Sequence, residues 1–98
     1  MGDYKDLIVY QKVYKLAMDI HKESMKFPRE EKYGLTDQIR RSSRSVCTNL
    51  AESYRRRKYK AHFLSKLSDS ESENTETEVW LDFSYDCRYL HETKYQEL

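Results

Sequence analysis

The chain has 98 residues, enough for one small domain, and its 18 basic and 17 acidic side chains leave a net charge of +1. It contains no run of about 20 apolar residues and no charged-then-apolar leader, so we expect neither a membrane-spanning helix nor a signal peptide. Two glycines and one proline are too few for the turns of a β-sheet protein, so the composition predicts a few long helices.

The first predicted helix covers about residues 7–26. Asp6 is placed to cap it by accepting a hydrogen bond from a free backbone N–H. Apolar residues recur at spacings of three, four and seven and therefore share one helical face. The members of this face are Val9, Val13, Leu16, Ala17, Ile20 and Phe27. Pro28 ends the helix, because proline disfavours α geometry in the residue before it.

Two further helices are predicted at about residues 35–54 and 59–89, joined at a corner formed by residues 55–58. No Gly or Pro marks this corner, so one continuous helix is the alternative. The buried stripe of the second helix is expected to be Leu35, Ile39, Ser43, Val46 and Leu50. The stripe of the third helix is expected to be Phe63, Leu67, Ser70, Asn74, Thr77, Leu81 and Ser84.

Residues 92–98 are expected to form the start of a fourth helix. Three long helices and this segment, joined by short links, predict one all-α domain over residues 1–98. Its architecture is an antiparallel up-down four-helix bundle, with the fourth helix truncated in this chain.

The near-zero net charge hides a separation of charge along the chain. Residues 40–60 hold eight basic residues and one acidic residue, whereas residues 69–92 hold eight acidic residues and one basic residue. In a hairpin of the second and third helices, Arg40, Arg41 and Arg44 lie across from a polar and acidic stretch. This stretch comprises Ser70, Glu73, Asn74 and Glu76. We therefore expect these three arginines to pair with carboxylates of the third helix.

The remaining cations of this segment gather at the predicted corner. They are Arg55, Arg56, Arg57, Lys58 and Lys60, and Tyr54 and Tyr59 interleave with them. In the hairpin register, only Asp3 and Asp6 are expected as acidic neighbours. Five cations with aromatic rings at an exposed corner could hold phosphates and unpaired bases, which makes this the candidate nucleic-acid site. A solvated charged corner without a ligand is the alternative.

The sequence indicates neither a metal site nor a catalytic motif. No two of the candidate soft ligands share a turn at the spacing that zinc sites use. These ligands are Cys47, Cys87, His21, His62 and His91. Two reduced, buried thiols in a cytoplasmic protein are expected instead. Glu73 and Glu76 share a helical side but lack the nearby histidine of di-iron bundles, and no glycine loop could cradle a phosphate. We expect no enzyme, no metal and no cofactor.

Four blocks, at residues 4–12, 33–42, 45–52 and 76–83, resemble a known family. They are YKDLIVYQK, YGLTDQIRRS, SVCTNLAE and ETEVWLDF. The family comprises the four-helix bundle proteins encoded in intervening sequences of bacterial 23S rRNA genes, together with their chromosomal relatives. The resemblance implies a cytoplasmic bacterial protein without known catalytic activity that assembles as a ring, in known cases a homopentamer. It also implies a role in binding RNA or other nucleic acid.

A related branch of that family serves as the accessory protein of diversity-generating retroelements and binds a reverse transcriptase and nucleic acid. The chain departs from the family pattern in two places. Ser53 stands where the family usually has Gly, which predicts a longer second helix. Family members also continue past the position of Leu98 to complete the fourth helix. Either the chain is truncated, or a partner completes the last helical face.

Two hypotheses of function follow. The first is a non-enzymatic, self-assembling bundle that binds RNA through residues 55–60, with Arg40, Arg41 and Arg44 as secondary contributors. The alternative is a homo-oligomeric protein-interaction scaffold, or an accessory factor for a partner enzyme such as a reverse transcriptase. In that case an exposed apolar face or the acidic face of the third helix docks the partner.

Overall fold

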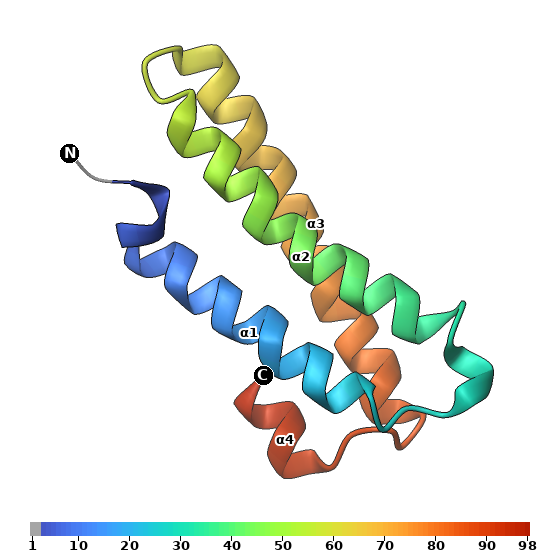
Figure 1. The fold of residues 1–98 in the computed structure, drawn as a ribbon. Helices are drawn as coiled ribbons and strands as arrows, with labels where there is room; N and C mark the ends of the chain where they lie inside the picture. Colours follow the sequence, from blue (N-terminus) through green and yellow to red (C-terminus); the bar gives the residue numbers. More distant parts are fainter. Residues whose placement is uncertain (1–2) are drawn as a thin grey trace.

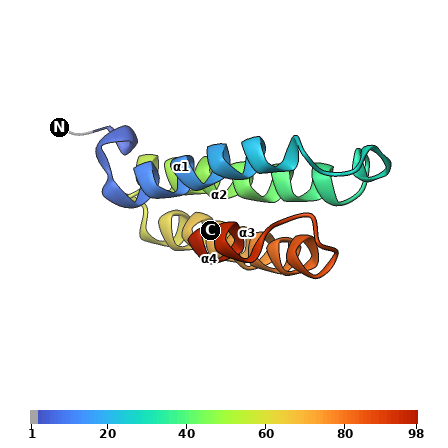
Figure 2. The same ribbon diagram turned by 90° about the horizontal axis from the view of Figure 1, so that it is seen from below.

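The computed structural model describes residues 3–98, and over that range it consists of helices and turns without strands (Figure 1). The four α-helices are α1 (Ile8–Ser24), α2 (Leu35–Arg55), α3 (Lys60–Asp86) and α4 (Glu92–Glu97). Two 3-10 turns, η1 (Tyr4–Asp6) and η2 (Arg29–Glu31), precede α1 and α2. The long helices run up and down in turn, and α2 and α3 lie side by side (Figures 1 and 2). The predicted all-α four-helix bundle is confirmed, with a short fourth helix.

The start of α1 differs from the prediction. The Asp3 carboxylate accepts the N–H of Tyr4 at 2.7 Å, and the Asp6 carboxylate accepts the N–H of Asp3 at 3.1 Å. These reciprocal bonds form a capping box on η1. The prediction that Asp6 caps the first long helix is therefore wrong, because its carboxylate is used one turn earlier. α1 begins after Leu7, whose side chain makes no capping hydrogen bond.

The apolar core lies at the end of the bundle where α4 and the α1–α2 connection meet. Its buried members are Ile20, Phe27, Leu35, Ile39, Leu81 and Leu90. Leu16, Trp80, Tyr89, Tyr95 and Leu98 pack against this cluster and are partly buried. Tyr95 holds α4 against α3, because its ring stacks on Tyr85 at 4.5 Å between centroids and its hydroxyl donates to Asp82. The core is thus at the opposite end from the α2–α3 corner (Figure 1).

Small polar side chains fill the interface between α2 and α3. Ser70 Oγ donates to the carbonyl oxygen of Val46 at 2.9 Å, and Thr77 Oγ1 lies 2.9 Å from Ser42 Oγ. Every buried side-chain oxygen or nitrogen over residues 3–98 has a hydrogen-bond partner, so burying this polar stripe leaves no group unsatisfied. The stripe predicted for the second helix is buried at all five positions, and the stripe of the third at four of seven.

The stripe predicted for the first helix is only partly buried. Ala17 and Ile20 are buried as expected, whereas Val9 is 52% exposed. Val9 lies near the start of α1, and α4 is confined to the other end of that helix (Figure 1). No helix among the described residues therefore covers this part of the stripe, and the expected burial of Val9 is wrong.

α3 ends at Asp86, three residues before the predicted end. Arg88 adopts the left-handed conformation, with a φ of 66°. The N–H groups of Tyr89 and Leu90 then turn back to the carbonyl of Ser84, at 2.8 and 3.3 Å. This reversal ends the helix and places Leu90 in the apolar core.

Candidate nucleic-acid interface

The chain reverses between α2 and α3 without a glycine. α2 ends at Arg55, and the N–H of Arg56 bonds to the carbonyls of Glu52 and Ser53, at 3.2 and 3.0 Å. The N–H of Tyr59 bonds to the carbonyl of Arg56 at 2.8 Å, which closes the turn into α3. The alternative of one continuous helix is therefore excluded. Ser53 lies inside α2, which runs on past it to Arg55.

We call the cations at this turn the basic corner, which consists of Arg55, Arg56, Arg57, Lys58 and Lys60. All five are exposed, and none forms an ion pair with any residue between 3 and 98. The guanidinium of Arg57 lies over the ring of Tyr54, 4.1 Å from its centroid, and donates to the Tyr54 carbonyl at 2.9 Å. Tyr59 as a whole residue is 66% exposed. The basic corner thus presents unneutralised positive charge beside an open aromatic ring.

The acidic residues that were expected near the basic corner do not pair with it. The carboxylates of Asp3 and Asp6 accept backbone N–H groups of η1 instead. The side chain that η1 brings to the corner is Tyr4, whose ring centroid is 5.7 Å from the guanidinium carbon of Arg55. A cation within about 6 Å of a ring centroid is attracted to the ring face. This contact orients the side chain of Arg55 but does not neutralise its positive charge.

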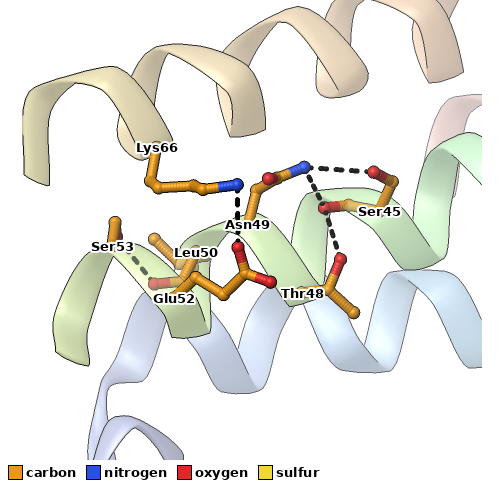
Figure 3. Close-up of polar contacts among 7 residues, drawn as sticks. All are labelled: Ser45, Thr48, Asn49, Leu50, Glu52, Ser53 and Lys66. Atoms are coloured by element: carbon orange, nitrogen blue, oxygen red, sulfur yellow. Dashed lines mark hydrogen bonds and ion pairs between the residues drawn. The ribbon is translucent and has the colours of Figure 1, made fainter. Parts of the chain in front are cut away.

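Glu52 is the one acidic residue between positions 40 and 60, and a lysine of α3 neutralises it. Lys66 Nζ reaches across from α3 and lies 2.9 Å from the Glu52 carboxylate (Figure 3). In the same view, the Asn49 amide donates to the carbonyl and the hydroxyl of Ser45, at 3.0 and 3.1 Å. These polar groups satisfy one another, so Glu52 does not neutralise the cations of the basic corner.

Arg40, Arg41 and Arg44 do not pair with α3 as predicted. Arg40 Nε donates to Ser24 Oγ of α1 at 2.7 Å. Arg44 Nη2 lies 3.1 Å from His21 Nδ1, also of α1. Arg41 is exposed and has no ion pair over residues 3–98. The expected ion pairs with third-helix carboxylates are therefore wrong.

The predicted position of these arginines along the axis of the hairpin is correct, but the predicted direction of their side chains around α2 is wrong. Ser42 of α2 meets Thr77 of α3, so this part of α2 does lie beside the acidic part of α3. Each helical residue is turned by about 100° from the one before it. Arg40 and Arg44 are each two residues from Ser42, and they therefore point to the other side of α2, where α1 packs.

A row of tyrosines, which was not predicted from the sequence, leads from the basic corner along α1. The ring of Tyr4 meets that of Tyr10 edge-on at 5.0 Å, and Tyr10 lies 6.0 Å from Tyr14. Burial raises the pKa of the Tyr10 phenol, and nearby Cys47 adds to the effect, so this hydroxyl stays protonated. The spacing of four residues between Tyr10 and Tyr14 was the available signal. The contact of Tyr4 with Arg55 had no signal, because it depends on how η1 packs.

The part of the chain that the structure describes gathers no group of three or more His, Cys, Asp or Glu residues that could hold a metal. Cys47 is buried and Cys87 is exposed, and both are free thiols. The expectation of two buried thiols is wrong for Cys87, which lies at the C-terminal cap of α3. None of the helices between residues 3 and 98 combines the length and apolar character that crossing a membrane requires.

A comparison with protein families matches residues 5–98 to the 23S rRNA-intervening sequence protein. The chain belongs to this family. The match covers both helices that carry the basic corner. A comparison with curated proteins finds no significant match.

Two of the four blocks that resemble the family contribute mainly to packing, whereas residues 4–12 contain no buried residue. Residues 33–42 and 45–52 supply the buried side chains of Leu35, Ile39 and Val46, among others. The basic corner begins only after these blocks. Membership of the family fixes the fold, whereas the function has to be argued from the exposed residues.

Proposed function

We propose that this member of the 23S rRNA-intervening sequence protein family is a non-enzymatic, self-assembling bundle of the bacterial cytoplasm that binds RNA or other nucleic acid through the basic corner. The observation that carries the proposal is the set of five exposed cations at the α2–α3 turn that have no carboxylate partner within residues 3–98. Exposed cations without a carboxylate partner bind phosphates favourably, because each contact releases condensed counterions from the nucleic acid.

The arginines and the aromatic rings have separate tasks in this proposal. Arg55 and Arg56 offer planar donor forks that match the geometry of a phosphate. Tyr59, with its exposed ring, offers a surface on which an unpaired base can stack. Phosphate contacts carry no sequence information, so the sequence preference at the corner itself is weak. Arg41, exposed on α2, is a secondary phosphate contact.

Charge reversal tests the proposal directly. The variant carries Arg55→Glu, Arg56→Glu and Arg57→Glu, and its affinity for single-stranded and structured RNA is measured by fluorescence anisotropy. We expect binding to be lost, because the three new carboxylates repel phosphates. An affinity equal to that of the unmodified protein for both kinds of RNA would refute the proposal.

A matched variant controls for net charge. Lys26→Glu, Arg29→Glu and Lys32→Glu produce the same change in charge on exposed residues of the α1–α2 connection, at the far end of the bundle. This control should keep its affinity for RNA. An equal loss in both variants would show that the overall charge of the protein, and not the basic corner, governs binding.

Self-assembly is the second part of the proposal, and the family resemblance points to a homopentamer. Each chain has a mass of 11.9 kDa, so a pentamer has a native mass of about 60 kDa. Light scattering after size exclusion measures this mass, and the ratio of absorbance at 260 and 280 nm reports co-purified nucleic acid. A monomeric mass would refute self-assembly.

A second candidate function is a homo-oligomeric scaffold or accessory factor that docks a partner such as a reverse transcriptase. The exposed apolar surface of α3 at the core end favours it. Val79 and Phe83 are exposed there, and Phe83, Trp80 and Leu35 line a hollow of about 300 Å³. Apolar side chains that are exposed together are typical of docking surfaces. A protein partner that is still captured after nuclease treatment would support the scaffold function.

A further inference from the structure

A pocket of about 290 Å³ lies between α1 and α2. Tyr10, Tyr14 and Met18 line it from α1, and Arg44 and Cys47 line it from α2. Tyr14 is 53% exposed and Met18 is 42% exposed, so their apolar surfaces are open to a ligand. Small-molecule sites usually measure about 300–1,000 Å³. The pocket is at the lower limit of that range and suits a single planar ring system.

A single aromatic side chain links the pocket to the basic corner. The guanidinium of Arg55 lies over the ring of Tyr4, and Tyr4 meets the ring of Tyr10, which lines the pocket. The guanidinium carbon of Arg55 lies 5.7 Å from the ring centroid of Tyr4, and that centroid lies 5.0 Å from the ring centroid of Tyr10. The guanidinium of Arg55 is therefore at most about 11 Å from the ring of Tyr10. Successive phosphates of one strand advance by about 3.4 Å along a stacked duplex, so this distance corresponds to at most about three nucleotides. A strand whose phosphate is held by Arg55 therefore has a base within reach of the pocket.

Arg44 brings unpaired hydrogen-bond donors to the pocket. Its one polar contact within residues 3–98 is with His21 Nδ1, at 3.1 Å. Arginine can only donate, so His21 Nδ1 is the acceptor in this contact. The other N–H groups of Arg44 remain available as a planar fork. Burial raises the pKa of the Cys47 thiol, so the pocket holds no thiolate that would repel an electron-rich ligand.

We infer that this pocket receives one unpaired base of the RNA bound at the basic corner, and that guanine is the base that fits best. The inference rests on the proposed function. The rings of Tyr10 and Tyr14 supply the stacking surface, which any base can use. The fork of Arg44 pairs with O6 and N7 of guanine, two acceptors that lie side by side. Adenine places an amino donor at one of these positions, where it meets another donor.

Single-stranded oligonucleotides test the inference. The probes are oligouridylates of about ten nucleotides, within the usual site size of roughly 4–16 nucleotides, with G, A or an abasic site at the centre. We expect the protein to bind the G probe about tenfold more tightly than the A probe, which is the discrimination of one bidentate contact. Fluorescence anisotropy at fixed salt measures both affinities.

Arg44→Gln exchanges the two-donor fork for an amide with one donor and one acceptor. This pattern matches N6 and N7 of adenine and does not match O6 and N7 of guanine. The variant should therefore bind the A probe at least as tightly as the G probe. Arg29→Gln is the matched control for the lost charge, because Arg29 is exposed and does not line the pocket. It should retain the preference for G.

Tyr14→Ala tests the stacking surface. We expect this variant to bind the G probe about tenfold more weakly and the abasic probe as before, because stacking needs a base. Tyr14 is largely exposed, so its removal should leave the fold intact, which circular dichroism checks.

The outcomes separate this inference from the proposed function. Equal binding of the G and A probes by the unmodified protein overturns the inference, as does a G preference that survives Arg44→Gln. In either case the proposed function still stands when charge reversal at the basic corner abolishes binding. If that reversal leaves all binding unchanged, both fail. If Tyr14→Ala lowers the native mass, the pocket is a contact between copies of the chain and the inference is overturned.

Discussion

Reversing Arg55, Arg56 and Arg57 to glutamate should change the salt dependence of RNA binding as well as the affinity. The basic corner offers five exposed cations without ion pairs among residues 3–98. Each contact with a phosphate of a single strand contributes about −0.7 to the slope of log affinity against log salt. Five contacts give a slope of about −3.5, so raising the salt from about 50 to about 200 mM should weaken binding roughly 100-fold.

In the triple variant, Lys58 and Lys60 are the cations that remain at the corner. Any binding that this variant retains at low salt should then show a slope no steeper than about −1.4, so the same increase in salt should weaken it by less than about tenfold. The α2–α3 turn should survive, because backbone groups make the hydrogen bonds that close it. The assay is a titration of fluorescence anisotropy at several salt concentrations, with circular dichroism as the check on folding.

The matched charge reversal of Lys26, Arg29 and Lys32 should keep the slope near −3.5. A slope in the triple variant as steep as that of the unmodified protein would refute the reasoning, because the three arginines would then make no phosphate contacts. An equally flattened slope in the matched variant would show that the overall electrostatic field of the protein, and not the basic corner, governs RNA binding.

Three further predictions concern stability and are checked by urea denaturation. Thr77→Val removes the hydroxyl that meets Ser42 in the buried α2–α3 interface and should lower the free energy of unfolding by about 1–3 kcal/mol. Arg88→Gly should raise it by about 1 kcal/mol, because glycine adopts the φ of 66° without steric cost, and a loss of stability would contradict this. The hydrogen bond to Asp82 raises the pKa of Tyr95 in the folded state, so its contribution is complete below about pH 10 and is lost at higher pH. Tyr95→Phe should make this alkaline loss smaller.

Burial along α2 could be predicted because it repeats with the local period of the helix. All five stripe residues are buried, including Ser43, whose hydroxyl donates to the carbonyl of Ile39 at 2.7 Å. The serine therefore needs no partner from another helix. The α2–α3 corner was predictable for a related reason. Residues 55–58 are four consecutive cations, which neither face of a packed helix can bury.

What the sequence could not supply is the direction in which neighbouring helices lie. The hairpin register predicts which part of α3 lies beside Arg40 and Arg44. Their hydrogen-bond partners, however, depend on where α1 packs around α2. The exposure of Val9 likewise depends on how much of α1 is covered by α4. The contact of Tyr4 with Arg55 joins segments about 50 residues apart in the sequence, and no local period reports such a contact.

The separation of charge lets a protein of net charge +1 present a strongly basic site. The ion pair between α2 and α3 joins Lys66 to Glu52 and so neutralises the one anion of the basic segment. The acids of α3 begin at Asp69, nine residues after Lys60, or about 14 Å along the helix at about 1.5 Å per residue. Physiological salt screens charges beyond about 8 Å, so these acids act weakly on a phosphate at the corner.

At about 0.01 M salt the screening length reaches about 30 Å, and the acids should then repel the strand and flatten the salt dependence. A slope that stays constant to that concentration would show that the acidic face of α3 does not oppose binding.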